Sequence, residues 1–249
     1  MNSLYTGLRA YWPLVNKDQV VGSMTSTNVG AVAFSSGIVV GASSHDGTSG
    51  KRIDFSSGGG LPLGNSPRTW AGWCFNRSGV ATQDALFSYG TTVVESRYAV
   101  FTNQGTSGTV YLEHFGNDYA SPTATISTGV WNFLVWTYSG GTLSTTTISL
   151  YVNSSAVGTA KSGAGSGAST TVDGPGAIGI NTDGMVLAHN GMLAEIAMWS
   201  RVLSYGEIYW LYNKGLGRTY PFDGRPAPAL KTVGPGVMHR RNRLTGPAV

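Results

Sequence analysis

Charged residues are scarce in this chain, which has 249 residues of which 11% are Asp, Glu, Lys or Arg. No helical pattern rich in Ala, Glu, Lys and Leu dominates, which argues against a mainly helical protein. No apolar run approaches the roughly 18 residues that a membrane span needs, so we expect no membrane partner. The segment Met1–Tyr5 lacks a basic region followed by an apolar stretch. We therefore predict no secretory signal and synthesis in a cytoplasm.

Cysteine is nearly absent as well. Cys74 is the single cysteine, which excludes a disulfide within the chain. It lies in the apolar run 70–75, and this context predicts a buried small hydrophobic side chain rather than a reactive thiol.

Glycine and aromatic residues are abundant instead. The chain has 36 Gly, 7 Trp, 12 Tyr and 8 Phe, with hydrophobic residues at 41%. Ser, Thr and Asn supply much of the remainder. This mixture is typical of many short strands joined by tight turns.

The net charge of +4 is concentrated at the C-terminus. Residues 223–249 contain five basic residues and one acidic residue, whereas residues 1–222 hold equal numbers of each sign. We therefore divide the chain into a domain at 1–222 and a basic, proline-containing C-terminal arm at 223–249. The neutral body offers no electrostatic footprint for nucleic acid, and the arm alone is not specific for it.

Alternation of apolar and polar residues predicts the strands. In Ile148–Asn153 one face is apolar and the other polar, whereas Val130–Tyr138 is apolar on both faces and suits a central strand. The other expected strands are Leu8–Leu14, Val32–Phe34, Arg52–Phe55, Arg68–Phe75, Ala85–Tyr89, Tyr98–Thr102, Thr109–Phe115, Ala177–Ile180 and Gly191–Trp199.

Turn signals separate these strands, and no helical pattern is interleaved between them, which predicts an antiparallel sandwich or barrel. One short helix follows the last strand. Ser204 and Glu207 have the spacing of a capping box, and Lys214–Gly215 resembles a C-terminal stop.

Five segments in order resemble the laminin G-like domains of the concanavalin A-like superfamily. They are Leu8–Leu14, Trp131–Tyr138, Ile148–Asn153, Ile178–Ile180 and Met192–Ser204. The resemblance implies an all-β fold of two antiparallel sheets, a jelly-roll sandwich, with the first and last strands close together and one short C-terminal helix. Two departures stand out: Ala194 replaces an acidic residue of the family pattern, and Ser154 replaces a hairpin glycine.

Catalytic patterns are not visible. Retaining glycosidases need two carboxylates about 5 Å apart. Glu195 is alone on the closing strand, and Glu113 has no acidic neighbour two or four residues away. We therefore expect no enzymatic activity, and a glycoside hydrolase is the least favoured alternative. His114 is open to a catalytic or ligand role, but a strand residue hydrogen-bonded locally is the favoured interpretation.

Metal binding is not predicted either. The histidines have no zinc-site spacing. Asn117–Asp118 and Asn181–Gly184 could offer oxygen ligands to calcium, but Asn and Asp are equally expected as turn formers. We therefore expect no cofactor, with calcium possible and not supported.

Two groups of residues remain as candidate binding sites. Asn117, Asp118 and Tyr119 form the most plausible rim cluster for a sugar, with a solvent-exposed loop as the favoured alternative. The arm combines basic and apolar residues that could attach the domain to a partner subunit, against the alternative of a disordered end. Those arm residues are Arg225, Lys231, Met238, Arg240, Arg241 and Arg243.

A usually extracellular fold, no predicted signal and an attachment arm together favour a virion component. The hypothesis is a structural or adhesion protein of a bacteriophage, on the capsid as decoration or on a tail or fibre, with other virion subunits or further copies as partners. A lectin-like carbohydrate-binding module, extracellular and directed at cell-surface glycans, is the alternative. This step rests on fold analogy.

Overall fold

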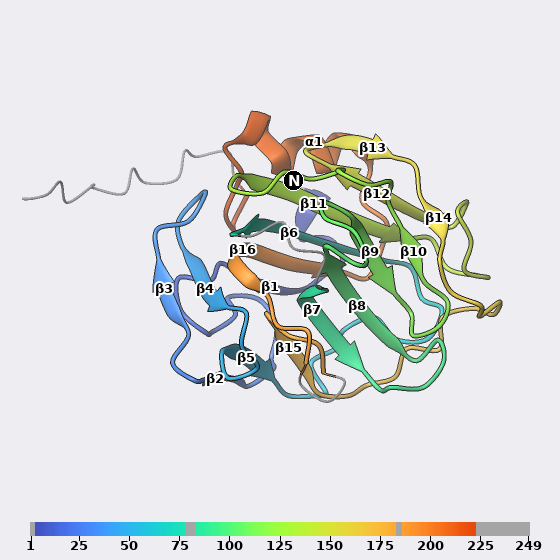
Figure 1. Cartoon of the computed structure of the whole chain (residues 1–249), viewed down its shortest axis with the longest axis horizontal. Helices are drawn as coiled ribbons and strands as arrows, with labels where there is room; N and C mark the ends of the chain where they lie inside the picture. The colour runs from blue at the N-terminus through green and yellow to red at the C-terminus, as the bar shows by residue number, and fades with distance from the viewer. Residues whose placement is uncertain (1–2, 78–82, 183–185, 223–249) are drawn as a thin grey trace, which may run out of the picture.

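The computed structural model describes residues 3–77, 83–182 and 186–222. Two eight-stranded antiparallel sheets face each other, as Figure 1 shows. Sheet A runs in the order β13 (Ser155–Val157), β12 (Ile148–Val152), β11 (Trp131–Tyr138), β6 (Arg68–Asn76), β16 (Asn190–Trp199), β4 (Ala42–Asp46) and β3 (Ala33–Ser35), and β1 (Leu8–Trp12) pairs with β16.

Sheet B forms the opposite layer. Its order is β14 (Ala160–Lys161), β10 (Tyr119–Ala120), β9 (Val110–Glu113), β8 (Arg97–Thr102), β7 (Asp84–Gly90), β15 (Gly176–Ile178), β5 (Arg52–Phe55) and β2 (Ser26–Val29). The predicted jelly-roll sandwich is confirmed, and β1 and β16, the first and last strands, lie side by side.

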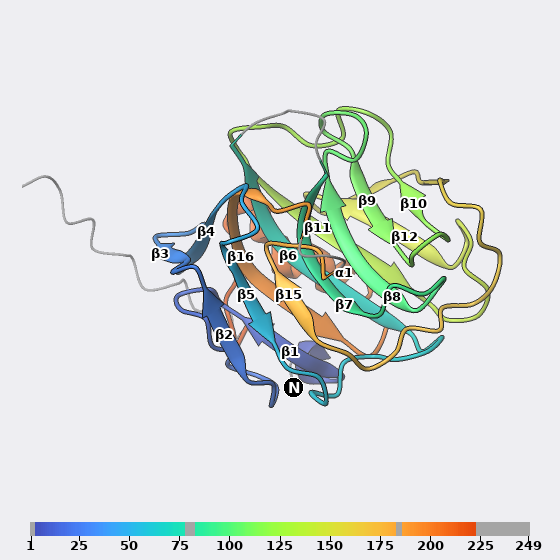
Figure 2. The same ribbon diagram turned by 60° about the horizontal axis from the view of Figure 1, so that its bottom comes forward.

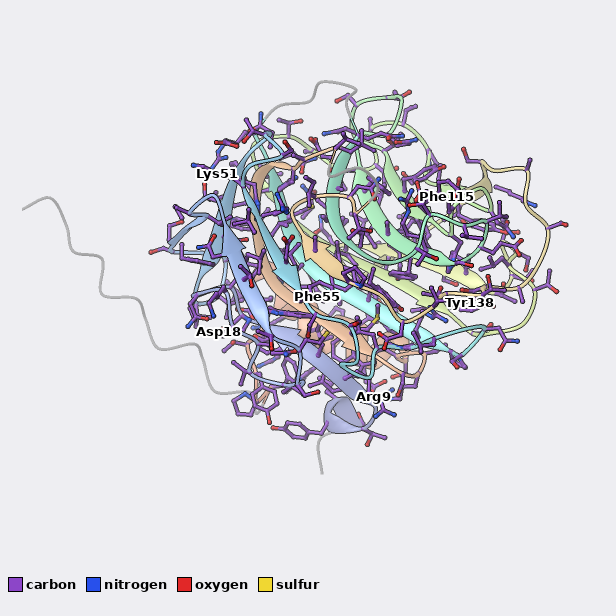
Figure 3. All side chains as sticks on the ribbon, turned by 90° about the horizontal axis from the view of Figure 1, so that it is seen from below. Arg9, Asp18, Lys51, Phe55, Phe115 and Tyr138 are labelled. Carbon is purple, nitrogen blue, oxygen red and sulfur yellow. The ribbon has the colours of Figure 1, made fainter. Side chains whose placement is uncertain are left out.

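The main core fills the space between the sheets. Trp12 packs against Phe55 at 5.1 Å between ring centroids, and Phe55 stacks on Phe87 at 5.5 Å. Cys74 is buried in this core, as the sequence predicts. Figure 3 shows Phe55 among the inner side chains, with Asp18 at the periphery. Burial of large aromatic rings is the main source of stability in such a core.

A second core lies on the outer face of sheet A, under the helix α1 (Tyr205–Tyr212). Ile208 and Leu211 are its buried helical residues. Figure 2 shows α1 behind the strands of sheet A, away from sheet B. The short 3-10 helices η1 (Ser3–Tyr5) and η2 (Asn213–Gly215) flank it.

The predicted capping box is present. The Ser204 hydroxyl accepts from the backbone N–H of Glu207, and the Glu207 carboxylate accepts from the backbone N–H of Ser204 at 2.8 Å. The end of the helix differs from the prediction, because Asn213 rather than Gly215 is the C-cap. Its φ of 49° is left-handed, a conformation that Asn tolerates well.

Strand β16 contains a bulge between Ala194 and Ala197. Glu195 has a φ of 55° there, and Ala194 and Glu195 both lie on the outer side, while Ile196 returns to the main core. A bulge therefore re-aims one side chain out of the regular alternation. Within the described residues, no helix is long and apolar enough to cross a membrane.

Candidate functional site

The predicted rim cluster is not exposed. Asn117 and Tyr119 are each 0% exposed, and Asp118 is 8% exposed. The Asn117 amide donates to Glu95 Oε1 at 3.0 Å and to the carbonyl of Gly167 at 3.2 Å. These bonds join the loops that precede β8 and β10 to the loop around residue 167. The expectation of an exposed aromatic in this cluster is therefore wrong.

Tyr119 is buried because of its place on β10. It pairs with Leu112 of β9, and both side chains belong to the main core. Asp118 accepts from the backbone N–H of His114 at 3.1 Å, and burial raises its pKa. The cluster therefore stabilises loops in this structure, and its contact with a sugar stays a prediction.

His114 also differs from its favoured interpretation. Its ring is fully buried against Tyr98 and Tyr138, with centroids 5.4 and 5.8 Å away. Neither ring nitrogen has a hydrogen-bond partner among the described residues. Burial, and then the nearby charge of Arg68, keep its pKa well below 6.5, so the imidazole is neutral.

The two carboxylates considered for hydrolysis occupy separate, engaged positions. Glu113, on the outer face of sheet B, forms an ion pair with Arg97. Glu195 is on the outer side of sheet A, 4% exposed beneath the α1 region, and it accepts from the Tyr11 hydroxyl. Burial raises the pKa of Glu195 well above 4.5. The two acids therefore belong to different faces of the sandwich.

The remaining predicted residues are only partly described. The arm residues Arg225, Lys231, Met238, Arg240, Arg241 and Arg243 lie outside the described residues, as do Asp183 and Gly184 of the second calcium candidate. In the part of the chain that the structure describes, no three His, Cys, Asp or Glu side chains gather as metal ligands would.

A row of side chains that the sequence did not suggest crosses the outer face of sheet A. Strand pairing places Trp131 opposite Phe75, Phe75 opposite Met192, and Met192 opposite Ser44. The row therefore spans β11, β6, β16 and β4, which lie side by side in Figure 1. We call these four residues the aromatic row.

The aromatic row lies on the outer face of sheet A, where Trp131 and Met192 also pack against the edge of the second core. Cys74 and Leu193, the sequence neighbours of Phe75 and Met192, point into the main core, so the alternation turns the row outward. All four side chains of the row are half-buried. The Phe75 and Trp131 rings meet edge to face with centroids 5.8 Å apart. Three strand spacings give the row a length of about 14 Å.

Helix α1 bounds the row on one side. The next row of the sheet contains Trp73 and Phe133, and Tyr212 stacks on both with centroids at 5.9 and 6.2 Å. The C-terminal end of α1 therefore covers that neighbouring row, whereas the aromatic row beside it stays partly exposed. The aromatic row is therefore a narrow, partly exposed apolar strip beside the C-terminal end of α1.

A second aromatic surface lies on α1 itself. Tyr205, Tyr209 and Trp210 are 59%, 46% and 44% exposed. The Arg218 guanidinium stacks over the Trp210 ring at 3.7 Å. The Trp210 indole N–H donates to the carbonyl of Phe222 at 3.4 Å, so this surface adjoins the last described residue. Tyr, Trp and Arg together are typical of protein interfaces.

Comparison with protein families identifies the family of this chain. Residues 45–209 match the family model described as the concanavalin A-like lectin/glucanases superfamily. The chain belongs to this superfamily. Comparison with curated protein sequences found no match.

Solved structures of the same general fold are distant in sequence. Domain 4 of AbnA, an extracellular arabinanase from Geobacillus stearothermophilus solved with arabinotriose, is 16% identical, with a TM-score of 0.57 over 85% of this chain and 98% of that domain. The binding domain of Paraclostridial Mosquitocidal Protein 1 is 13% identical, with a TM-score of 0.61 over 84% of this chain and 52% of that one. The receptor binding domain of botulinum neurotoxin D is 13% identical, with a TM-score of 0.60 over 84% of this chain and 53% of that one.

This chain thus spans nearly all of the arabinanase domain and about half of the two toxin domains. At these identities the likeness concerns the fold. In this chain the bulge in β16 buries Glu195 beneath α1. A binding role has to be argued from the surfaces of this chain.

Proposed function

We propose that this protein is a non-catalytic, lectin-like module that binds carbohydrate on the aromatic row. The observation that carries the proposal is the register of the row, which sets Trp131, Phe75 and Met192 side by side on three neighbouring strands. Ser44 continues the row onto a fourth strand.

The aromatic row suits the shape and chemistry of a sugar. A pyranose ring has an apolar face of C–H groups and an edge of hydroxyl groups. The half-buried Trp131 and Phe75 rings offer an apolar, polarisable surface to such a face. Ser44 offers a hydroxyl that can exchange hydrogen bonds with the edge. A surface that is apolar with a few placed polar groups is typical of small-ligand sites.

The non-catalytic part of the proposal rests on the two acids. Glycoside hydrolysis needs a matched pair of carboxyl groups around one bond. Glu113 is paired with Arg97 on one sheet, and Glu195 is buried on the other. Neither adjoins the aromatic row. Two of the similar solved structures are binding domains, and the arabinanase domain was solved with arabinotriose, which supports a binding role for this fold.

The test is a glycan array followed by isothermal titration calorimetry with each oligosaccharide retained. Trp131→Ala should weaken binding by about 2 kcal/mol, or about thirtyfold in Kd, as expected for a central aromatic contact. Trp210→Ala is the matched control, because it removes an exposed indole on α1 instead. Circular dichroism should show that both variants are folded. Equal affinity of Trp131→Ala and the native chain would refute the site.

A second function, assembly into a virion or another particle, is favoured by the α1 surface. Tyr209 and Trp210 are exposed beside Phe222, the residue from which the arm 223–249 continues. An arm and an aromatic patch at its base could engage one partner subunit together. Deleting 223–249 should convert oligomers or particle-bound protein into monomers in size-exclusion chromatography with light scattering. Unchanged assembly after the deletion would reject the arm's role.

A further inference from the structure

A basic side chain extends along one end of the aromatic row. Arg77 directly follows β6, and its backbone N–H donates to the carbonyl of Asn190 at the start of β16. Its guanidinium reaches across β16 to β4, where it donates to the Ser44 hydroxyl at 2.6 Å and to the carbonyl of His45. Arg77 is exposed. The positive charge therefore lies at the Ser44 end of the row.

This charge has no carboxylate partner among the described residues. Both hydrogen bonds of the guanidinium are to neutral oxygens, those of Ser44 and His45. Two acids near Asn190, Asp46 and Asp84, are engaged elsewhere. Asp46 accepts from the Thr48 hydroxyl at 2.7 Å and lies 3.5 Å from Lys51, and Asp84 accepts from the Asn103 amide at 2.6 Å.

The contacts of Arg77 also fix its position. Two of its N–H groups donate to acceptors on β4 and hold the guanidinium on the sheet. The side chain therefore loses less conformational freedom when a ligand binds. Arg has five N–H donors, and the bonds to Ser44 and His45 account for two of them. The planar guanidinium is suited to binding a carboxylate or another oxyanion through paired hydrogen bonds.

The width of the strip selects the kind of ligand. Tyr212 covers Trp73 and Phe133 on one side, so a ligand must be narrow and run across the strands. A stable interface between proteins usually buries about 800 Å² on each partner, which is far broader than one row of side chains. A short saccharide, about 14 Å long, fits the row from Trp131 to Ser44.

We propose that the ligand of the aromatic row is an anionic saccharide, whose acidic group binds the Arg77 guanidinium while its sugar rings pack on Trp131 and Phe75. The inference rests on the proposed carbohydrate-binding function and specifies its ligand class. The acidic group can be a carboxylate, as in a uronic acid, or a sulfate ester. Both present oxyanions to the same donors.

The experiment uses the full chain and an array of matched trisaccharides in neutral, carboxylated and sulfated forms. Retained sugars are then titrated against the native chain, Arg77→Gln, Arg9→Gln and Trp131→Ala. Arg9 is the matched control. It is also exposed, donates to a serine hydroxyl, Ser200 Oγ at 2.9 Å, and has no carboxylate partner among the described residues.

The native chain should bind at least one anionic form about ten- to a hundredfold more tightly than its neutral counterpart, as expected for a charge-assisted hydrogen bond. Arg77→Gln should lose that preference and keep the affinity for the neutral sugar. Arg9→Gln should keep both, and the preference should weaken as salt is added. The carboxylated and sulfated arms identify which oxyanion is bound.

The outcomes separate the two proposals. Equal affinity for neutral and anionic forms, or an anionic preference that survives Arg77→Gln, overturns the inference and leaves the lectin function standing. Absence of binding to every sugar, or binding untouched by Trp131→Ala in a folded variant, overturns both. Self-association of the native chain that Trp131→Ala abolishes would identify the row as a contact between copies and also overturn the inference.

Discussion

Acid should destabilise this protein through two histidines buried at one end of the sandwich. His45 and His189 are each 0% exposed, and their ring centroids are 6.0 Å apart. Burial lowers the pKa of His45 to about 4 and that of His189 to about 3. The His45 ring is held as a neutral tautomer, because Nδ1 lies 3.0 Å from the carbonyl oxygen of Lys51 and Nε2 lies 2.9 Å from the Ser43 hydroxyl.

Whether stability rises or falls with pH depends on which state, folded or unfolded, binds protons at the higher pH. An unfolded histidine has a pKa of about 6.5, so the unfolded chain takes up protons at higher pH than the folded chain. The contribution of these two histidines to stability is therefore complete above about pH 6.5 and is lost as the pH falls toward their folded pKa values of about 4 and 3. At pH 5 the loss is about 2 kcal/mol for each imidazole, since one pKa unit corresponds to about 1.4 kcal/mol.

Asp84 opposes part of this loss. Burial raises its pKa to about 6, so its contribution to stability is present below its ordinary value near 3.8 and is lost as the pH rises through about 6. When the pH is lowered from 7 to 5, protonation of Asp84 raises the free energy of unfolding by about 1.4 kcal/mol. The two histidines and Asp84 sum to a loss of about 2 to 3 kcal/mol. Buried His114 adds to this loss for the same reason, whereas the raised pKa values of Asp118 and Glu195 oppose it, so a substitution is needed to isolate the contribution of His45.

The assay is urea unfolding at pH 7, 6 and 5, followed by tryptophan fluorescence in the native chain and in His45→Gln. Gln cannot take up a proton, so the difference in unfolding free energy between pH 7 and pH 5 should shrink by about 2 kcal/mol in the variant, whatever its stability at pH 7. An unchanged difference in His45→Gln would refute the reasoning.

Three further predictions concern the fold. Ser204→Ala should lower the unfolding free energy by about 1 kcal/mol in urea titrations, because the capping box is lost, and no change would mean that the cap is energetically idle. Phe87→Ala should cost about 3 to 5 kcal/mol, because Phe87 packs against Trp12 and Phe55 in the main core, and a loss under 1 kcal/mol would argue against that packing. Cys74 should not react with a thiol reagent until the chain unfolds, since burial raises its pKa, and rapid native-state labelling would contradict its buried position.

Strands with strong apolar alternation could be predicted from the sequence, and polar strands could not. The expected strand Arg52–Phe55 coincides with β5, and Val130–Tyr138 differs from β11 by one residue. Strand β4 was missed because Ala42–Asp46 reads Ala-Ser-Ser-His-Asp, which is small and polar. Strand β2 was missed for the same reason. Tertiary pairing overrides weak local preference in such segments.

The rim cluster shows a different limit. Asn117, Asp118 and Tyr119 have the composition of an exposed turn, and composition alone favours an aromatic at the surface. The pairing of Tyr119 with Leu112 instead turns the ring inward. One residue of register decides which face a strand side chain occupies, and that register depends on a strand partner elsewhere in the sequence.

The aromatic row could not be predicted from the sequence for a related reason. Trp131 and Phe75 were both recognised as strand residues, but nothing local states that they share a row with Met192 and Ser44. Those neighbours come from strand pairings that join residues more than fifty positions apart, and the position of Arg77 over Ser44 depends on the same pairings. A binding surface built across a sheet is a property of the register. The sequence can supply its residues, and only the paired strands supply its shape and the location of its charge.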